Sequence, residues 1–207
     1  MYPSMKSLLS NNGGVAAVEF ALVVPVLIFL LLGVVELNLL LTMDRKVSQT
    51  AATVSDLIAR ERKMSDSDMT NIFDSVKQVM VPYSSEGLTL NVGVVHFVES
   101  GKGDKKVIKP KTVWSVGRDG TGAPNLEPWT EGSPPTGIDI PDDIAIANSY
   151  LIIGESKYTH RPELGKFFPG GILAEIELSD VFFLQGRKVS CPEYKQKCDA
   201  DMKKTGS

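Results

Sequence analysis

The 207-residue sequence predicts an α+β fold in which a long N-terminal helix and a second helix precede a small antiparallel β-sheet. Three observations support this prediction. A long apolar run lies near the start of the chain, apolar residues then recur with the period of a helix, and from Gly87 the period changes to two, as in a strand. We expect one anchored domain with a modest core, because a chain of this length holds little more.

The first helix is expected from about residue 15 to residue 62. No charged side chain occurs between Phe20 and Val35, and the apolar run continues to Met43. About 20 apolar residues are enough to cross a bilayer as a helix, so residues 15–43 are predicted to span a membrane. A cleaved secretory signal is a poorer interpretation, because the run is too long and no small-x-small site follows it. Pro25 removes one backbone donor inside the segment, which predicts a kink.

The second half of this helix is amphipathic. Val47, Ala51, Val54 and Ile58 follow one another at i, i+4, i+7 and i+11, on one face of a helix. Residues 44–62 therefore continue the helix into an outer domain, residues 44–207. Residues 1–14 are expected to stay in the cytoplasm, because a short segment is easier to leave there than a large domain. The lysines and arginines on the two sides barely decide the orientation.

The outer domain is predicted to hold a second helix and four strands. The helix is expected at 66–81, after the N-cap-rich residues 65–68 and before Pro82. Residues 87–190 form the sheet region, with two pairs of strands. The strands are expected at 88–94, 107–116, 150–158 and about 172–184. The Gly- and Pro-rich residues 117–143 are predicted to form a long surface loop, and loops of this length are often functional or mobile.

No catalytic or metal-binding pattern occurs in the sequence. His96 follows strand alternation and is expected to be packed or at a sheet edge, whereas His160 is expected on a polar loop, and neither has metal-ligand spacing. Asp139, Asp142 and Asp143 offer oxygen ligands for calcium, but a solvated acidic loop is the preferred interpretation. We therefore predict that the chain is not an enzyme and uses no metal or cofactor. The sequence has no basic stripe with interleaved aromatic residues, which argues against nucleic acid as a partner.

Two cysteines lie close together near the C-terminus. In a reducing compartment, Cys191 and Cys198 would be free thiols, whereas in the periplasm they can close a small loop. If the domain is exported, we favour the disulfide. Trp114 and Trp129 are candidate interface anchors, although packing in the core or in a loop is the simpler interpretation.

Glu19 is a carboxylate at the start of a segment suited to lipid, where a charge needs a reason. If the chain is cut after Gly14, Glu19 becomes the fifth residue of a new N-terminus. Its carboxylate can then pair with an ammonium group of a neighbouring subunit, and this pair would stabilise the correct register of helices in a bundle. Alternatively, Glu19 lies at the boundary of the lipid headgroups. Physical chemistry alone does not decide between these two interpretations.

Residues 14–37, GVAAVEFALVVPVLIFLLLGVVEL, resemble the N-terminus of the TadE/TadG-like proteins of bacterial tight-adherence (Tad/Flp) pilus assembly systems. The pattern G-x-x-x-x-E-F is similar to the motif at which a prepilin peptidase cuts the pseudopilins of this family, and Pro25 and Glu36 also fit. Looser similarity extends to D-L-I-A-R, V-P-Y-S, S-K-Y-T-H-R-P and I-E-L-S-D-V-F-F-L-Q-G-R. One departure is Gln185-Gly186-Arg187, where the family often has an R-P-R-like run.

This resemblance implies a pilin-like arrangement and processing between Gly14 and Val15, with Glu19 and Phe20 governing assembly and helix register. The implied protein is a minor pseudopilin that assists assembly or initiation of a type IVb pilus for surface adhesion, with its outer domain in the periplasm. The implied partners are the inner membrane, the major Flp-type pilin, other minor pseudopilins, the prepilin peptidase and the platform proteins. The alternative is an uncleaved single-pass anchor whose outer domain binds an assembly partner or the cell envelope.

Overall fold

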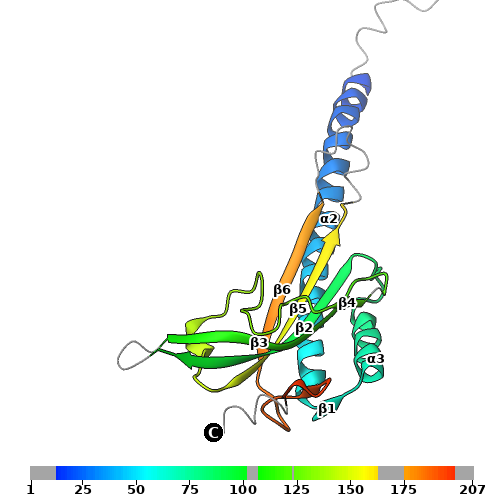
Figure 1. The fold of residues 1–207 in the computed structure, drawn as a ribbon. Helices are drawn as coiled ribbons and strands as arrows, with labels where there is room; N and C mark the ends of the chain where they lie inside the picture. The colour runs from blue at the N-terminus through cyan, green and yellow to red at the C-terminus, as the bar shows by residue number, and fades with distance from the viewer. Residues whose placement is uncertain (1–12, 102–106, 123, 163–174, 199–207) are drawn as a thin grey trace, which may run out of the picture. The chain divides into compact units, whose positions relative to one another are not determined.

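The computed structural model describes residues 13–101, 107–122, 124–162 and 175–198 (Figure 1). The helix α2 (Gly13–Ala59) opens the described chain, and α3 (Asp66–Lys77) is followed by the short 3-10 helix η1 (Gln78–Met80). The chain divides into two compact units. The first comprises residues 1–41 and 161–174, and the second comprises residues 42–160 and 175–207.

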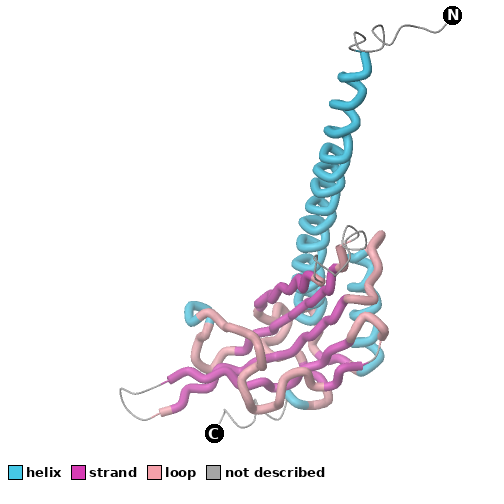
Figure 2. The backbone as a smooth tube through the Cα atoms, turned by 90° about the horizontal axis from the view of Figure 1, so that it is seen from above, coloured by secondary structure: helices cyan, strands magenta, loops and turns pink. Residues whose placement is uncertain are grey.

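One antiparallel sheet of five strands forms the centre of this unit, in the order β4-β3-β2-β5-β6. The strands are β2 (Leu88–Ser100), β3 (Val107–Arg118), β4 (Pro124–Leu126), β5 (Tyr150–His160) and β6 (Ile176–Leu184). The predicted α+β fold is confirmed. The two predicted pairs of strands lie in one antiparallel sheet, because β2 bonds to both β3 and β5. Figure 2 shows these strands side by side.

The second half of α2 packs on one face of this sheet. Its side chains Val47, Ala51, Val54 and Ile58 are at most 1% exposed, which confirms the predicted apolar face. The contact with β5 is close, because a Cβ atom on Gly154 would lie 2.2 Å from Ser55 Oγ and 2.8 Å from the carbonyl oxygen of Ala51. Beside it, Ser156 Oγ donates a hydrogen bond of 2.7 Å to the carbonyl oxygen of Val47.

The helix α3 covers the same face next to α2. It begins with a capping box, in which Ser65 Oγ accepts from the Asp68 amide and the Asp68 carboxylate accepts from the Ser65 amide. Its apolar side chains Met69, Phe73 and Val76 are buried. The helix ends before Pro82, at Lys77.

The opposite face of the sheet carries a second core, to which residues that were predicted to be a surface loop contribute. Within residues 117–143, the chain forms β4 and buries Trp129, which is 2% exposed; η2 (Asp142–Ile144) follows at the end of the segment. The Trp129 ring lies on β2, since a Cβ atom on Gly93 would be 2.8 Å from it. The prediction of a surface loop was therefore wrong for Trp129 and its surroundings. The second core comprises Val95, Phe97, Trp129, Leu151 and Ile153, with Ile138, Ile140 and Ile144 packed against it.

Four further predictions concern single side chains and strand ends. His160 is the last residue of β5 and is only 7% exposed, so its prediction as loop surface was wrong, because β5 extends to pair His160 with Ile176. His96 is buried in β2 and stacks on Tyr150, with ring centroids 4.3 Å apart. Trp114 is buried in the helix-side core. The predicted start of the fourth strand, near residues 172–174, lies outside the described residues.

Candidate functional site

The first half of α2 exposes apolar side chains around its whole circumference. From Val15 to Leu41, most of its large apolar side chains are between 42% and 71% exposed. Within the described residues, one helix is long and apolar enough to cross a membrane, and the most apolar part of that helix is not buried in the protein. A helix that is apolar on all sides needs an apolar environment, which lipid or neighbouring helices supply.

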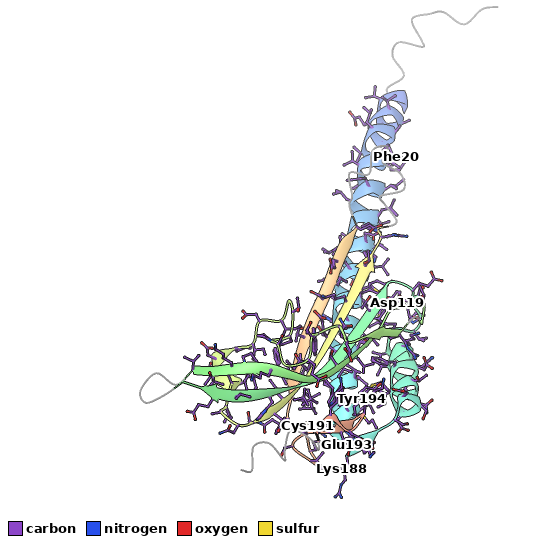
Figure 3. All side chains as sticks on the ribbon, in the orientation of Figure 1. Phe20, Asp119, Lys188, Cys191, Glu193 and Tyr194 are labelled. Carbon is purple, nitrogen blue, oxygen red and sulfur yellow. A yellow bond between two sulfur atoms is a disulfide. The ribbon has the colours of Figure 1, made fainter. Side chains whose placement is uncertain are left out.

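The structure places the predicted processing and register residues together at the beginning of α2. Gly14, Val15, Glu19 and Phe20 lie within the first turns of the helix, and all four are exposed (Figure 3, which labels Phe20). Val15 and Glu19 are four residues apart, so their side chains lie on one side of the helix, one above the other. Val15 and the Glu19 carboxylate are thus both accessible to a neighbouring chain.

Two glycines and one proline lie in this half of α2. A Cβ atom on Gly14 or on Gly33 would meet nothing within 4 Å. Neither glycine is therefore needed to avoid a clash with another described residue, and the described part of the chain leaves room for alanine at either position. Pro25 lies inside the helix and is exposed. A kink at Pro25 stays a prediction.

The predicted disulfide between Cys191 and Cys198 is present, with the two Cα atoms 5.9 Å apart. It belongs to a segment that we call the clasp, residues 186–198. Both cysteines are at most 3% exposed. Trp114 Nε1 donates a hydrogen bond of 2.9 Å to the carbonyl oxygen of Pro192, and the Trp114 ring packs against Tyr194 with centroids 5.4 Å apart. The disulfide therefore closes a loop that is part of the core.

The clasp also binds the C-terminal end of α2. The Arg187 amide donates to the carbonyl oxygen of Ala59 over 2.9 Å, and the Arg187 guanidinium lies 2.6 Å from the Asp56 carboxylate. The Glu193 amide donates to the carbonyl oxygen of Arg62 over 2.9 Å. The short strands β1 (Lys63–Met64) and β7 (Glu193–Tyr194) pair beside it. The clasp thus supplies a partner for the carbonyl group of Ala59 at the end of α2, one of the groups that a helix end leaves unpaired, and for the carbonyl group of Arg62 just beyond the helix.

Two pKa shifts mark the contact between the clasp and α3. The Tyr194 hydroxyl donates a short hydrogen bond to the Asp66 carboxylate. This bond, with a smaller contribution from Lys195, lowers the pKa of Asp66 below its usual value. Burial, followed by the bond to Asp66, raises the pKa of Tyr194 well above its usual value. The carboxylate and the neutral phenol are thus the favoured forms of this pair.

A surface cavity of about 270 Å³ lies beside this contact, between α3, β3 and the clasp. Phe73 forms part of its apolar lining, and its charged side chains pair with acids: Arg118 lies 3.3 Å from Asp74 and Lys195 lies 3.4 Å from Asp66. Among the described residues, no histidine or cysteine lines it. In the same described part of the chain, no group of three or more His, Cys, Asp or Glu side chains is placed to hold a metal ion.

Comparison with known families singles out α2. Residues 14–56 match the family model described as TadE-like protein. The chain carries a TadE-like segment. The predicted resemblance is confirmed over these residues, which begin at Gly14 and include both the exposed apolar half of α2 and most of its amphipathic half. No curated protein and no solved structure matches the chain.

The clasp contacts were not foreseen outside the disulfide. Arg187 and Trp114 have no distinctive spacing in the sequence, and both bind backbone carbonyl groups, which a residue pattern does not encode.

The burial of the sheet on both faces did have a signal in the sequence, namely the two apolar dipeptides Val94-Val95 and Ile152-Ile153. Neighbouring residues of a strand point to opposite faces, so these pairs indicate a sheet buried on both sides.

Proposed function

We propose that this chain is a minor pseudopilin-like structural protein that assists assembly or initiation of a Tad/Flp pilus. One observation carries the proposal: the TadE-like match begins at Gly14, where the prepilin-type motif begins, and continues through the exposed apolar helix. In this proposal residues 1–14 are the leader, residues 15–43 cross the inner membrane and residues 44–207 face the periplasm. The partners are the major pilin, other minor pseudopilins, the prepilin peptidase and the platform proteins.

The proposed role of Glu19 follows from its place in the helix. Cleavage after Gly14 gives Val15 a free α-ammonium group, and Glu19 lies one turn further along. In a bundle, the carboxylate of one subunit pairs with the ammonium group of its neighbour, and a low dielectric strengthens the attraction. The positive end of the helix dipole also favours the carboxylate. A shifted register would leave both charges unpaired in an apolar environment, which is costly.

The deciding experiment is terminal peptide mass spectrometry of the protein from the membrane fraction. We expect a peptide that begins at Val15, and we expect Gly14→Ala to abolish it. Gly33→Ala is the matched control, because both glycines lie in α2 and neither has a neighbour within 4 Å of an added Cβ atom. An intact 1–14 segment, in cells with an active prepilin peptidase, would leave an uncleaved anchor whose outer domain binds an assembly partner or the cell envelope.

A second experiment tests the register role alone. We expect Glu19→Ala to insert into the membrane as well as the wild type, because it removes a charge from an apolar segment, yet to reduce pilus formation. Glu19→Gln should behave in the same way, because it keeps the size of the side chain and removes its charge. Normal piliation in the alanine variant would exclude the register role.

A further inference from the structure

The strands β2 and β3 continue beyond the part of the sheet where β5 accompanies them. Pairing of β2 with β5 ends at His96 opposite Tyr150, whereas pairing of β2 with β3 continues to Ser100 opposite Val107. Residues 98–100 and 107–109 therefore form a two-stranded ribbon, which Figure 1 shows in green at the left. A two-stranded ribbon adds little stability of its own. We therefore consider this ribbon as a surface for contact with another molecule.

One face of this end of the sheet is basic. Val107, Lys109 and Lys111 alternate along β3 and so point to one side of it, and all three are exposed. Lys109 lies opposite Val98, and Lys111 lies opposite His96, so this is the side on which the helices pack elsewhere in the sheet. We call these three residues the basic face. Val107 is 54% exposed, an apolar side chain beside two ammonium groups.

The other side carries an acidic counterpart. Asp142 and Asp143 of η2 are exposed, and Ile146, shortly after them, is 55% exposed. We call these three residues the acidic face. They belong to the side opposite the helices, because Ile144 of the same segment packs on the second core with Phe97. The amide of Asn148 donates to the carbonyl oxygen of Phe97 over 2.7 Å, which holds this segment beside β2.

The two faces match in composition and have opposite charge. Each has one exposed branched apolar residue and two charges of a single sign, and they lie on opposite sides of the sheet. We propose that the basic face of one copy of this chain docks on the acidic face of a second copy. Such a contact is heterologous, since it joins two different surfaces, and it can repeat from copy to copy. The charges would set specificity and register, and the apolar side chains would leave water.

Charge reversal tests this contact in the full-length chain in detergent, with self-association measured by energy transfer between two differently labelled preparations. We expect Lys109→Glu with Lys111→Glu to weaken association about tenfold, because two pairs of roughly 0.7 kcal/mol each are lost. Asp142→Lys with Asp143→Lys should weaken it similarly. A mixture of the two variants should regain wild-type association, because every contact between unlike copies again joins opposite charges.

Lys188→Glu and Glu61→Lys serve as matched controls, because both residues are exposed and lie outside the two faces. Their association should equal that of the wild type. The proposal is overturned if the wild type does not self-associate, if either double variant associates normally, or if the mixture is not restored. The result does not depend on cleavage at Gly14, so this proposal and the pseudopilin proposal fail independently.

Discussion

The two halves of α2 differ in where their apolar side chains lie. Up to Leu41 these side chains are exposed on all sides, whereas from Met43 onward they gather on one face and are buried against the sheet. Both halves form the same backbone helix, and the TadE-like match includes residues of both. The two halves thus share one backbone conformation, and the placement of polar residues decides whether a half needs lipid-like surroundings or a protein core.

Removing an isoleucine side chain from each half should affect the stability of the outer domain very differently, and the greatest loss is expected in the buried half. Ile58→Ala should lower the free energy of unfolding of the outer domain by about 2–5 kcal/mol, because it leaves a cavity in a packed core. Ile58 is fully buried, whereas Ile28 is 51% exposed, so Ile28→Ala should leave this stability unchanged. Denaturant unfolding of the full chain in detergent, followed by the fluorescence of the buried Trp114 and Trp129, measures both. Equal losses would contradict the comparison.

A smaller loss is expected at the end of the buried half, where the clasp binds. Replacing both Cys191 and Cys198 by serine should cost about 2–3 kcal/mol, because the closed loop restricts the unfolded chain. Reduction of the wild type should give the same shift in the unfolding midpoint. The doubly substituted variant is the control, since a reductant should not change its midpoint. A wild type that reductant leaves unchanged would show that the clasp does not depend on its disulfide.

The cap of α3 predicts an effect of about 1 kcal/mol. Ser65→Ala removes the hydroxyl that accepts from the Asp68 amide and leaves this donor at the helix start without its cap. The exposed Ser75 lies within the same helix and bonds the carbonyl oxygen of Asn71. Ser75→Ala should therefore be neutral or slightly stabilising, because alanine favours the helix. Thermal unfolding of the two variants separates the cap from a general effect of losing a serine.

The smallest effect is expected in the pH dependence of the contact between the clasp and α3. The pKa of Asp66 is lowered from 3.8, so its contribution is present above this value and is lost as the pH falls below it. The pKa of Tyr194 is raised from 10.0, so its contribution is present below this value and declines as the pH rises above it.

Stability profiles of Asp66→Asn and Tyr194→Phe test these two slopes. We expect the first variant to flatten the acid slope and the second to flatten the alkaline slope. Lys188→Ala is a suitable control, because Lys188 is exposed and lies in the clasp away from this pair. Slopes that match the wild type in both variants would remove Asp66 and Tyr194 from the pH response.

Much of the fold could be predicted from periodicity. The spacing of Val47, Ala51, Val54 and Ile58 identified the buried face of α2, and the alternation from Leu88 to Val94 identified the face of β2 that meets it. The α+β class and the disulfide followed from equally local signals. The motif at Gly14 and Glu19 was visible because the sequence holds it in consecutive helical turns, although its processing stays a prediction.

The second core could not be predicted in the same way. Trp129 lies among glycines and prolines that indicate a loop, and its burial depends on Gly93, a residue 36 positions earlier that leaves room for its ring. A bulge contributes as well, because the pairing of β2 and β3 shifts between Val94 and Val95 and skips Val113. These contacts depend on which strands become neighbours, and a linear pattern does not specify that.

The clasp has a consequence for the order of events in the cell. The last carbonyl group of α2, that of Ala59, receives its hydrogen-bond partner from Arg187, a residue that is synthesised long after the helix. Packing of the domain is therefore completed only after the clasp has joined it. In the proposed topology this occurs on the periplasmic side, so the chain crosses the membrane before its fold closes. In that topology export precedes the completion of folding, and the disulfide between Cys191 and Cys198 forms outside the cytoplasm.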